Sequence, residues 1–236
     1  MPPKKSSKAP TNETFNFYDK LPADLRSKPE NPDKDKHGLD LPFRAIILGS
    51  SGSGKTSTLF NFLSRCPTTF SKIILCVQDA SEPLYTHLIR TTDRDLLDVY
   101  QGGEVPPLSE YKSQEGNGLI IFDDLVVLSK AQHKPIEHWM IAGRKAGKCG
   151  FSMCYLSQSF YQIPKIIRLQ ANVLILKKLK SVNDLKYLLR DTSISASKED
   201  LMIKYEFATQ NQQDFLLIDL NAPAERQFRH NFLQIL

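Results

Sequence analysis

Residues 49–57 read Gly-Ser-Ser-Gly-Ser-Gly-Lys-Thr-Ser (GSSGSGKTS) and directly follow the apolar run Ala45–Leu48. The stretch fits the pattern GxxxxGK[ST] in the context that the pattern requires, with an apolar run before it and a segment of helical spacing after it. Glycines let backbone N–H groups converge on phosphate oxygens, and the following helix presents the positive end of its dipole to them. The sequence therefore predicts a phosphate-binding loop.

The residue types within this loop suggest how a nucleotide would be held. Lys55 is expected to bridge the β- and γ-phosphates, and the hydroxyl of Thr56 is expected to ligate Mg2+. ATP and Mg2+ are accordingly the expected ligands. The predicted nucleotide-binding residues form the loop itself: Gly49, Ser50, Ser51, Gly52, Ser53, Gly54, Lys55, Thr56 and Ser57.

Apolar runs alternate with segments of helical spacing from residue 41 to the end of the chain. The runs are RAIILG, KIILCVQ, GLIIFDDL, FSMCYLSQ, NVLILKK and DFLLIDL. They are continuously apolar, which indicates strands that are buried on both faces of a sheet. We therefore expect an α/β fold of three layers with a mainly parallel central sheet. The last run, the turn at 221–224 and the apolar residues after it predict a C-terminal edge hairpin.

Composition divides the chain into two parts. Residues 1–40 contain six prolines and little periodic apolar pattern, so we expect a flexible, basic N-terminal tail before a single domain at 41–236. The stretch 91–117, with its Gly-Gly and Pro-Pro pairs, interrupts the pattern as an insert. No apolar run approaches the roughly 20 residues that span a bilayer, and the N-terminus lacks the apolar stretch of a secretory signal. An intracellular, soluble protein without a membrane span is expected.

A second motif, LIIFDDL at residues 119–125, ends a predicted buried strand in two carboxylates. This is the form of a Walker B element. Asp123 is placed to hold Mg2+, and Asp124 is placed to polarise an attacking water. The alternative is a pair of surface aspartates that caps the next loop.

The order of the apolar runs along the chain predicts how the strands are arranged. One strand, KIILCVQ, lies between the two motifs, and another, FSMCYLSQ, follows the second motif. This order is similar to that of the additional-strand, RecA-like P-loop ATPases, in which the later strand inserts between the two motif strands. Gln158, at the end of that strand, is then a candidate sensor whose amide holds the γ-phosphate or the attacking water. A buried or capping amide is the alternative.

Positive charge is concentrated in one segment of a chain whose net charge is +5. Between Ile141 and Arg190 there are ten basic residues and one acid, Asp184. Such a segment suits a surface that faces a polyanion, although solvated helix faces would have the same composition. Two of these residues, Arg144 and Arg168, are candidate catalytic residues that would act in a neighbouring subunit as arginine fingers. A surface role is the alternative for each.

With these motifs in place, the chain resembles the FtsK-HerA superfamily of DNA-pumping ATPases, especially the viral branch that packages double-stranded DNA in poxviruses, giant viruses and virophages. The matching stretches are ILGSSGSGKTS, LIIFDDL, GRKAGKCGFSMCYLSQSFYQIPKIIR and NVLILKK. The resemblance implies a ring-shaped ATPase that translocates double-stranded DNA, with Gln158 as sensor and Arg144 or Arg168 acting in trans. One departure is Asp124, because many members carry glutamate there.

The resemblance also implies partners and a place of action. A homo-oligomeric ring, pentamer or hexamer, and a capsid or portal-site protein are the expected protein partners. The expected location is the virus assembly site in the host cell, or the virion.

Two other functions remain open. A small-molecule P-loop kinase would use the insert at 91–117 as a lid over its acceptor. An ATP-binding capsid assembly factor without processive translocation would be compatible with the Asp123-Asp124 pair. A GTPase is disfavoured because the chain has no NKxD base-recognition element.

Overall fold

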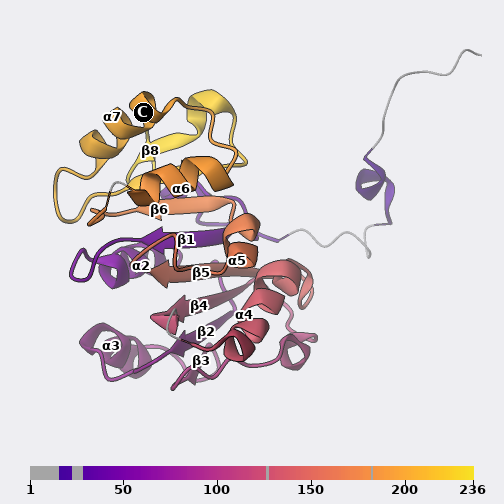
Figure 1. Ribbon diagram of the computed structural model, residues 1–236. Coiled ribbons are helices and arrows are strands. Elements are labelled where there is room, and N and C mark those ends of the chain that lie inside the picture. Colours follow the sequence, from indigo (N-terminus) through magenta and orange to yellow (C-terminus); the bar gives the residue numbers. More distant parts are fainter. Residues whose placement is uncertain (1–15, 23–28, 126–127, 182) are drawn as a thin grey trace, which may run out of the picture.

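The computed structural model describes residues 16–22, 29–125, 128–181 and 183–236 (Figure 1). Across these residues, nine strands form one sheet in the order β3-β2-β4-β5-β1-β6-β7-β8-β9. The strands are β1 (Arg44–Leu48), β2 (Lys72–Val77), β3 (Leu97–Tyr100), β4 (Gly118–Asp123), β5 (Phe151–Ser157), β6 (Val173–Leu176), β7 (Leu216–Asp219), β8 (Phe228–His230) and β9 (Gln234–Ile235).

The helices lie between these strands. The α-helices are α1 (Lys34–His37), α2 (Lys55–Ser64), α3 (Pro83–Thr91), α4 (Lys130–Ala142), α5 (Lys165–Gln170), α6 (Asn183–Asp191) and α7 (Lys198–Ala208). Short 3-10 turns are η1 (Phe17–Lys20), η3 (Leu108–Tyr111), η5 (Gly143–Lys145) and η6 (Ala224–Arg226). Local sequence explains several helix starts. For example, α4 begins with a capping box in which Ser129 and Gln132 bond each other's backbone.

The sheet has the predicted topology. β1 pairs in parallel with β5 on one side and β6 on the other, and β5 pairs in parallel with β4. The strand that follows the second motif therefore lies between the two motif strands, as the additional-strand order predicts. Beyond β6 the pairing becomes antiparallel, through β7, β8 and β9. The predicted C-terminal hairpin is β7 and β8, and β9 adds one further strand at its edge.

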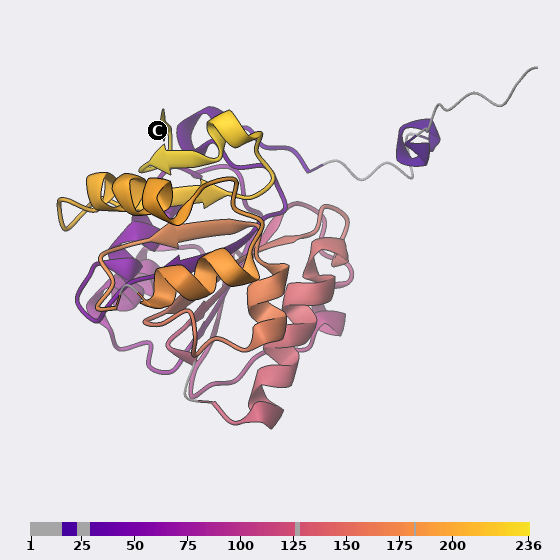
Figure 2. The same ribbon diagram turned by 45° about the horizontal axis from the view of Figure 1, so that its top comes forward.

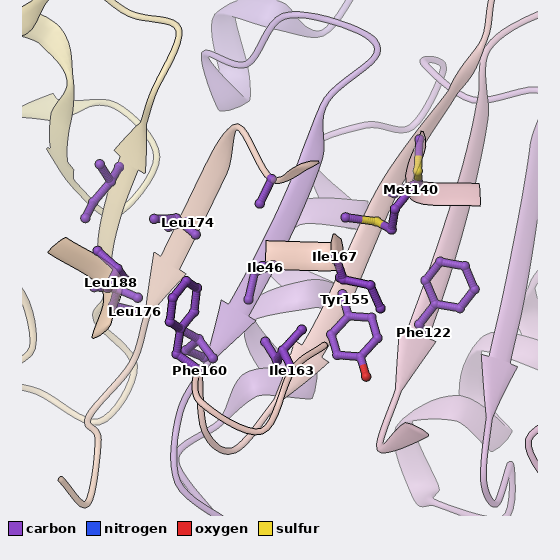
Figure 3. Packing of buried hydrophobic residues seen from close by; sticks show 14 of the residues in the cluster. Ile46, Phe122, Met140, Tyr155, Phe160, Ile163, Ile167, Leu174, Leu176 and Leu188 are labelled. Atoms are coloured by element: carbon purple, nitrogen blue, oxygen red, sulfur yellow. The ribbon is translucent and has the colours of Figure 1, made fainter. Parts of the chain in front are cut away.

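Two apolar cores lie on opposite faces of the sheet, because successive strand residues point to opposite sides. Ile46 and Leu48 belong to the core under α4 to α7, while Ala45 and Ile47 belong to the core under α2 and α3. Figure 3 shows the first core, with Ile46, Phe122 and Tyr155 meeting side chains of α4 and α5. Helices α4, α5 and α6 lie along one face in Figure 2. The three-layer α/β prediction is confirmed.

Three segments differ from the sequence expectation. The insert at 91–117 contains an edge strand, β3, which pairs in parallel with β2. Helix α7 was not anticipated. Residues 29–40, assigned above to a tail, pack against the domain: Asp33, His37 and Leu39 are all buried.

Asp33 explains why that segment is held. Its carboxylate pairs with Lys36 at 2.7 Å and accepts a hydrogen bond of 2.7 Å from the hydroxyl of Thr69. These contacts hold the pKa of Asp33 well below its usual range. A buried carboxylate with these partners ties residues 29–40 to the turn before β2.

Candidate functional site: a phosphate loop and the two carboxylates at the end of β4

The phosphate loop leaves β1 at the carboxyl edge of the sheet, where several strands end together. The register places Leu48 beside Ser157 and Asp123 beside Leu156. The backbone N–H of Gly49 donates to the carbonyl of Ser157 at 3.2 Å, so the loop is fastened to the end of β5. Both motifs and the end of the sensor strand therefore converge on one edge.

The loop conformation depends on glycine. Gly52 and Gly54 have φ of 72° and 87°, a region that L-residues rarely adopt, and Gly54 is the N-cap of α2. Within the described residues, the buried hydroxyl of Ser53 has no hydrogen-bond partner. A buried polar atom without a partner beside a helix N-terminus fits a loop built to receive an anion.

Lys55 lies across its own loop. Its amino group donates to the carbonyls of Gly49 at 2.9 Å and Ser50 at 3.2 Å. Burial lowers the pKa of Lys55, and the charges of Asp123 and Asp124 oppose that shift. A cation that is partly desolvated and holds only neutral carbonyls is suited to bind phosphate oxygens.

Asp123 and Thr56 meet at a tyrosine to which no sequence motif points. The hydroxyl of Tyr85, on α3, donates to Asp123 Oδ2 at 2.5 Å, and the Thr56 side chain interacts with the same hydroxyl. Burial raises the pKa of Asp123, while Tyr85 and Lys55 lower it. A hydroxyl and a carboxylate brought together in this way form the hard oxygen donor set that Mg2+ prefers. The two residues predicted to ligate Mg2+ are thus adjacent, and Mg2+ bound there would neutralise phosphate charge.

Asp124, the candidate base, is exposed at the carboxyl end of β4. Its φ of 56° is left-handed, which aspartate tolerates better than most residues. The backbone therefore turns sharply between the two carboxylates, which separates the half-buried Asp123 from the exposed Asp124.

Gln158, the candidate sensor, is exposed directly after β5. The loop that follows it is held by Asp184 of α6, another residue without an assigned role above. Asp184 Oδ1 accepts hydrogen bonds from the Ser159 hydroxyl at 3.0 Å and from the backbone N–H groups of Phe160 at 3.0 Å and Tyr161 at 3.3 Å. One carboxylate oxygen thus links the loop after Gln158 to α6.

The two candidate arginines have different surroundings. Arg144 is exposed in η5, and its backbone carbonyl lies against Gly150, the residue directly before β5, so it lies at the edge of the sheet opposite the phosphate loop. Arg168 is 7% exposed and pairs with Asp191 at 3.0 Å, with its guanidinium 5.2 Å from the Phe160 ring. A buried ion pair thus holds the Arg168 side chain inside the protein, whereas action in a neighbouring subunit requires the side chain to reach the surface.

The basic segment does not form one uniform surface. Arg168 and Lys177 are buried, whereas the other basic residues of 141–190 are exposed: Arg144, Lys145, Lys148, Lys165, Lys178, Lys180, Lys186 and Arg190. Among these, Lys148 pairs with Glu115 at 2.6 Å and Arg190 pairs with Asp191 at 2.8 Å. The segment's exposed charge is thus divided between the amino edge of the sheet, helices α5 and α6, and the end of β6.

Metal clusters and membrane-spanning helices would point to other kinds of function. In the described part of the chain, no group of three or more His, Cys, Asp or Glu side chains is arranged to hold a metal ion. Among the helices of that part, none has the length and apolarity to cross a membrane.

Comparison with solved structures shows the fold. The genome packaging NTPase B204 of Sulfolobus turreted icosahedral virus 2, in complex with AMPPCP, is 17% identical with a TM-score of 0.57, over 87% of this chain and 100% of that one. The pCW3 conjugation coupling protein TcpA is 14% identical with a TM-score of 0.52, over 83% of this chain and 62% of that one. The secretion ATPase EccC of Thermomonospora curvata is 12% identical with a TM-score of 0.51, over 94% of this chain and 31% of that one.

Comparison of sequences shows the family. No curated protein matches the chain. The model of the family described as poxvirus A32 protein matches residues 34–219, which is most of the chain. The two motifs, the strand order and this match agree on a P-loop ATP hydrolase of the viral branch that the sequence resembles. The chain belongs to the poxvirus A32 protein family.

Proposed function

We propose that this protein hydrolyses ATP to move double-stranded DNA into a viral capsid, working as a ring of identical subunits. Lys55, Thr56 and Asp123 would bind the phosphates and Mg2+, and Asp124 would orient the attacking water. Gln158 would respond to the γ-phosphate, and Arg144 would complete the site of the next subunit.

One observation carries the proposal: an aromatic and basic cluster begins three residues after Gln158. Tyr161 is 61% exposed, and its ring lies 4.9 Å from that of Tyr187 on α6. The guanidinium of Arg190 lies 4.9 Å from the Tyr187 ring. A hollow of about 320 Å³ is lined by Asn183, Lys186, Tyr187 and Arg190. Basic side chains beside aromatic rings suit contacts to the phosphates and sugars of DNA.

This cluster is connected to the nucleotide site by covalent and hydrogen bonds. Tyr161 belongs to the loop that starts at Gln158, and the Asp184 carboxylate binds that loop to the helix carrying Lys186 and Arg190. A movement of Gln158 on hydrolysis would therefore reach the cluster through one short loop. Such a link is what a DNA motor needs and what a kinase or a passive ATP-binding protein does not.

The alternatives have less support. The insert that would serve a kinase as lid is held at two places: β3 is paired with β2, and the indole N–H of Trp139 donates to the carbonyl of Pro106 at 2.8 Å. The assembly-factor alternative would show ATP binding without turnover. The viral relative of known fold is described as a genome packaging NTPase, which favours packaging among these functions.

The test is an ATPase assay titrated with long duplex DNA at several salt concentrations, read beside the native mass. We expect DNA to stimulate hydrolysis, the stimulation to fall steeply with salt because phosphate contacts release counterions, and subunits to assemble. An unchanged rate with and without DNA, together with a monomeric mass in both states, would end the proposal. Free phosphate as the product, independent of any acceptor, excludes the kinase.

Two variants test the assigned roles within the site. Lys55→Ala is expected to lose nucleotide binding, because the ammonium is the direct partner of the phosphates. Asp124→Asn is expected to keep binding and to lose turnover by about 100-fold or more, the usual effect of removing a catalytic base. Titration calorimetry and single-turnover hydrolysis separate the two effects, and equal loss of binding in both variants would contradict the assignment.

A further inference from the structure

Lys177 is a buried cation beside the phosphate loop. It follows β6 directly, is 1% exposed, and its backbone N–H donates to the carbonyl of Leu48 at 2.7 Å. Its stem packs against the first residue of the loop, since a Cβ placed on Gly49 would lie 2.7 Å from Lys177 Cβ. Its amino group lies 3.8 Å from where a Cβ on Gly54 would be. The side chain thus runs along the outside of the loop to the start of α2.

Among the residues described, the charge of Lys177 meets only neutral partners nearby, among them the ring of Phe215, whose centroid lies 6.0 Å from the ammonium. Its ammonium has three donors, and one of them bonds the backbone carbonyl of Gln212 at 2.7 Å. In the described ranges, no carboxylate forms an ion pair with it, and Asp214 acts only through its more distant charge. Burial accordingly lowers the pKa of Lys177. An ammonium removed from water without a counter-charge destabilises the fold.

The surroundings of Lys177 connect it to the loop from a second side. The side-chain amide of Gln212 donates to the carbonyl of Gly52 at 3.3 Å, so the turn between α7 and β7 contacts both the phosphate loop and Lys177. Lys177 is therefore in fixed contact with the loop at Gly49, near Gly54 and, through Gln212, at Gly52.

We propose that Lys177 is a positioning residue of the nucleotide site, whose buried charge is balanced by the phosphates of the bound nucleotide across the wall of the loop. This inference rests on the proposed function, because it takes the loop to bind ATP. Lys55 would touch the phosphates directly, and Lys177 would add to the positive potential of the loop from behind. The effect grows with phosphate charge, so it favours ATP over ADP and ADP over AMP.

The test compares Lys177→Met with Lys178→Met. Methionine keeps the length of the stem and removes the charge. The matched control loses the same charge one residue further on, where the side chain is exposed and the backbone carbonyl accepts a hydrogen bond from the Ser50 hydroxyl. Affinities for ATP, ADP and AMP are measured by titration calorimetry with Mg2+, and thermal unfolding is measured without nucleotide.

We expect Lys177→Met to bind ATP about tenfold more weakly, with smaller losses for ADP and AMP, because charges that are partly shielded from water interact appreciably. Its melting temperature without nucleotide should be unchanged or higher, because a buried charge has been removed. Lys178→Met should lose much less affinity for ATP.

Three results would overturn the inference: unchanged ATP affinity, an equal loss for all three nucleotides, or a loss accompanied by a lower melting temperature, which would mark a structural role. Lys55→Ala separates this outcome from failure of the function. If Lys55→Ala abolishes ATP binding while Lys177→Met binds normally, the ATP site of the proposed function stands and the role of Lys177 falls. A wild-type protein that binds no ATP would overturn both.

Discussion

The ionised carboxylate of Asp123 lowers the stability of the folded protein. Its carboxyl group is partly buried at the end of β4, and desolvation raises its pKa although Tyr85 and Lys55 act in the other direction. The folded state therefore binds this proton more readily than the unfolded state. Stability falls as pH rises from the unfolded pKa, about 3.9, through the raised folded pKa, and the penalty stays constant above it.

Replacing Asp123 by asparagine should remove that penalty. Without nucleotide and Mg2+, we expect Asp123→Asn to melt at a higher temperature than the wild type at pH 8, and the difference to shrink as pH is lowered towards 4. Hydrolysis dependent on Mg2+ should fall by about 100-fold or more, because a metal ligand is lost. Calorimetric melting curves across this pH range check the first expectation. Asp124→Asn is the control, since its carboxylate is exposed and its removal should leave the melting temperature unchanged.

Whether a residue of the site could be predicted from the sequence depends on how near its partners are along the chain. Lys55 and Thr56 could be assigned because a short motif fixes their geometry, and Asp123 could be assigned because it ends an apolar strand. Tyr85 could not, since its partner is 38 residues away and nothing local distinguishes it from other helix residues. The burial of Arg168 likewise depends on Asp191, which lies on another helix.

Among the elements, strands buried on both faces were the most predictable, because short, continuously apolar runs between turn residues are typical of such strands. Strand β3 was missed since its four residues, Leu97–Tyr100, are short and only partly buried. Helix α7 was missed because its buried residues are spaced among charged ones and give little amphipathic pattern. The packing of residues 29–40 depends on Thr69 and other distant partners, which a local pattern does not reveal.

The hydrogen bonds of Asp184, which join the loop after β5 to helix α6, allow a further prediction. Asp184→Ala removes the acceptor that holds Ser159, Phe160 and Tyr161, so the loop after Gln158 should lose its fixed relation to α6. We expect DNA stimulation of hydrolysis to fall by about tenfold, the loss of roughly 1.4 kcal/mol of coupling, with a smaller change in the rate without DNA. Asp184→Asn retains an acceptor oxygen and should restore most of the stimulation. Equal loss of both rates in Asp184→Ala would indicate a general structural role instead.

For the whole molecule, the proposed role of Arg144 in trans requires a head-to-tail ring. The phosphate loop lies at the carboxyl edge of the sheet and Arg144 near the amino edge, with β1, five residues or about 16 Å, between them. An arginine at that distance does not serve its own site. In a ring with heterologous contacts, opposite surfaces of neighbouring subunits meet, so Arg144 of one subunit can face the loop of the next.

A mixing experiment tests this arrangement. Arg144→Ala subunits keep an intact loop and should lose hydrolysis by about 10³-fold, the usual effect of an arginine finger. Lys55→Ala subunits lack phosphate binding but keep Arg144. Mixed, the two inactive proteins should recover part of the DNA-stimulated rate, because each mixed interface can contain one complete site. Lys145→Ala, in the same exposed turn, is the control. No recovery on mixing, or full activity of Arg144→Ala alone, would contradict a role in trans.

The position of β1 in the sheet also affects how the protein is made. This strand, which carries the phosphate loop, hydrogen-bonds to β5 and β6, and its first residue, Arg44, bonds Asn172, 128 residues later in the chain. At ordinary rates of translation, the ribosome needs on the order of ten seconds to add that many residues. Until β5 has been synthesised, this apolar strand lacks both of its neighbours in the sheet, and the nascent chain contains the motif for ATP binding without the site.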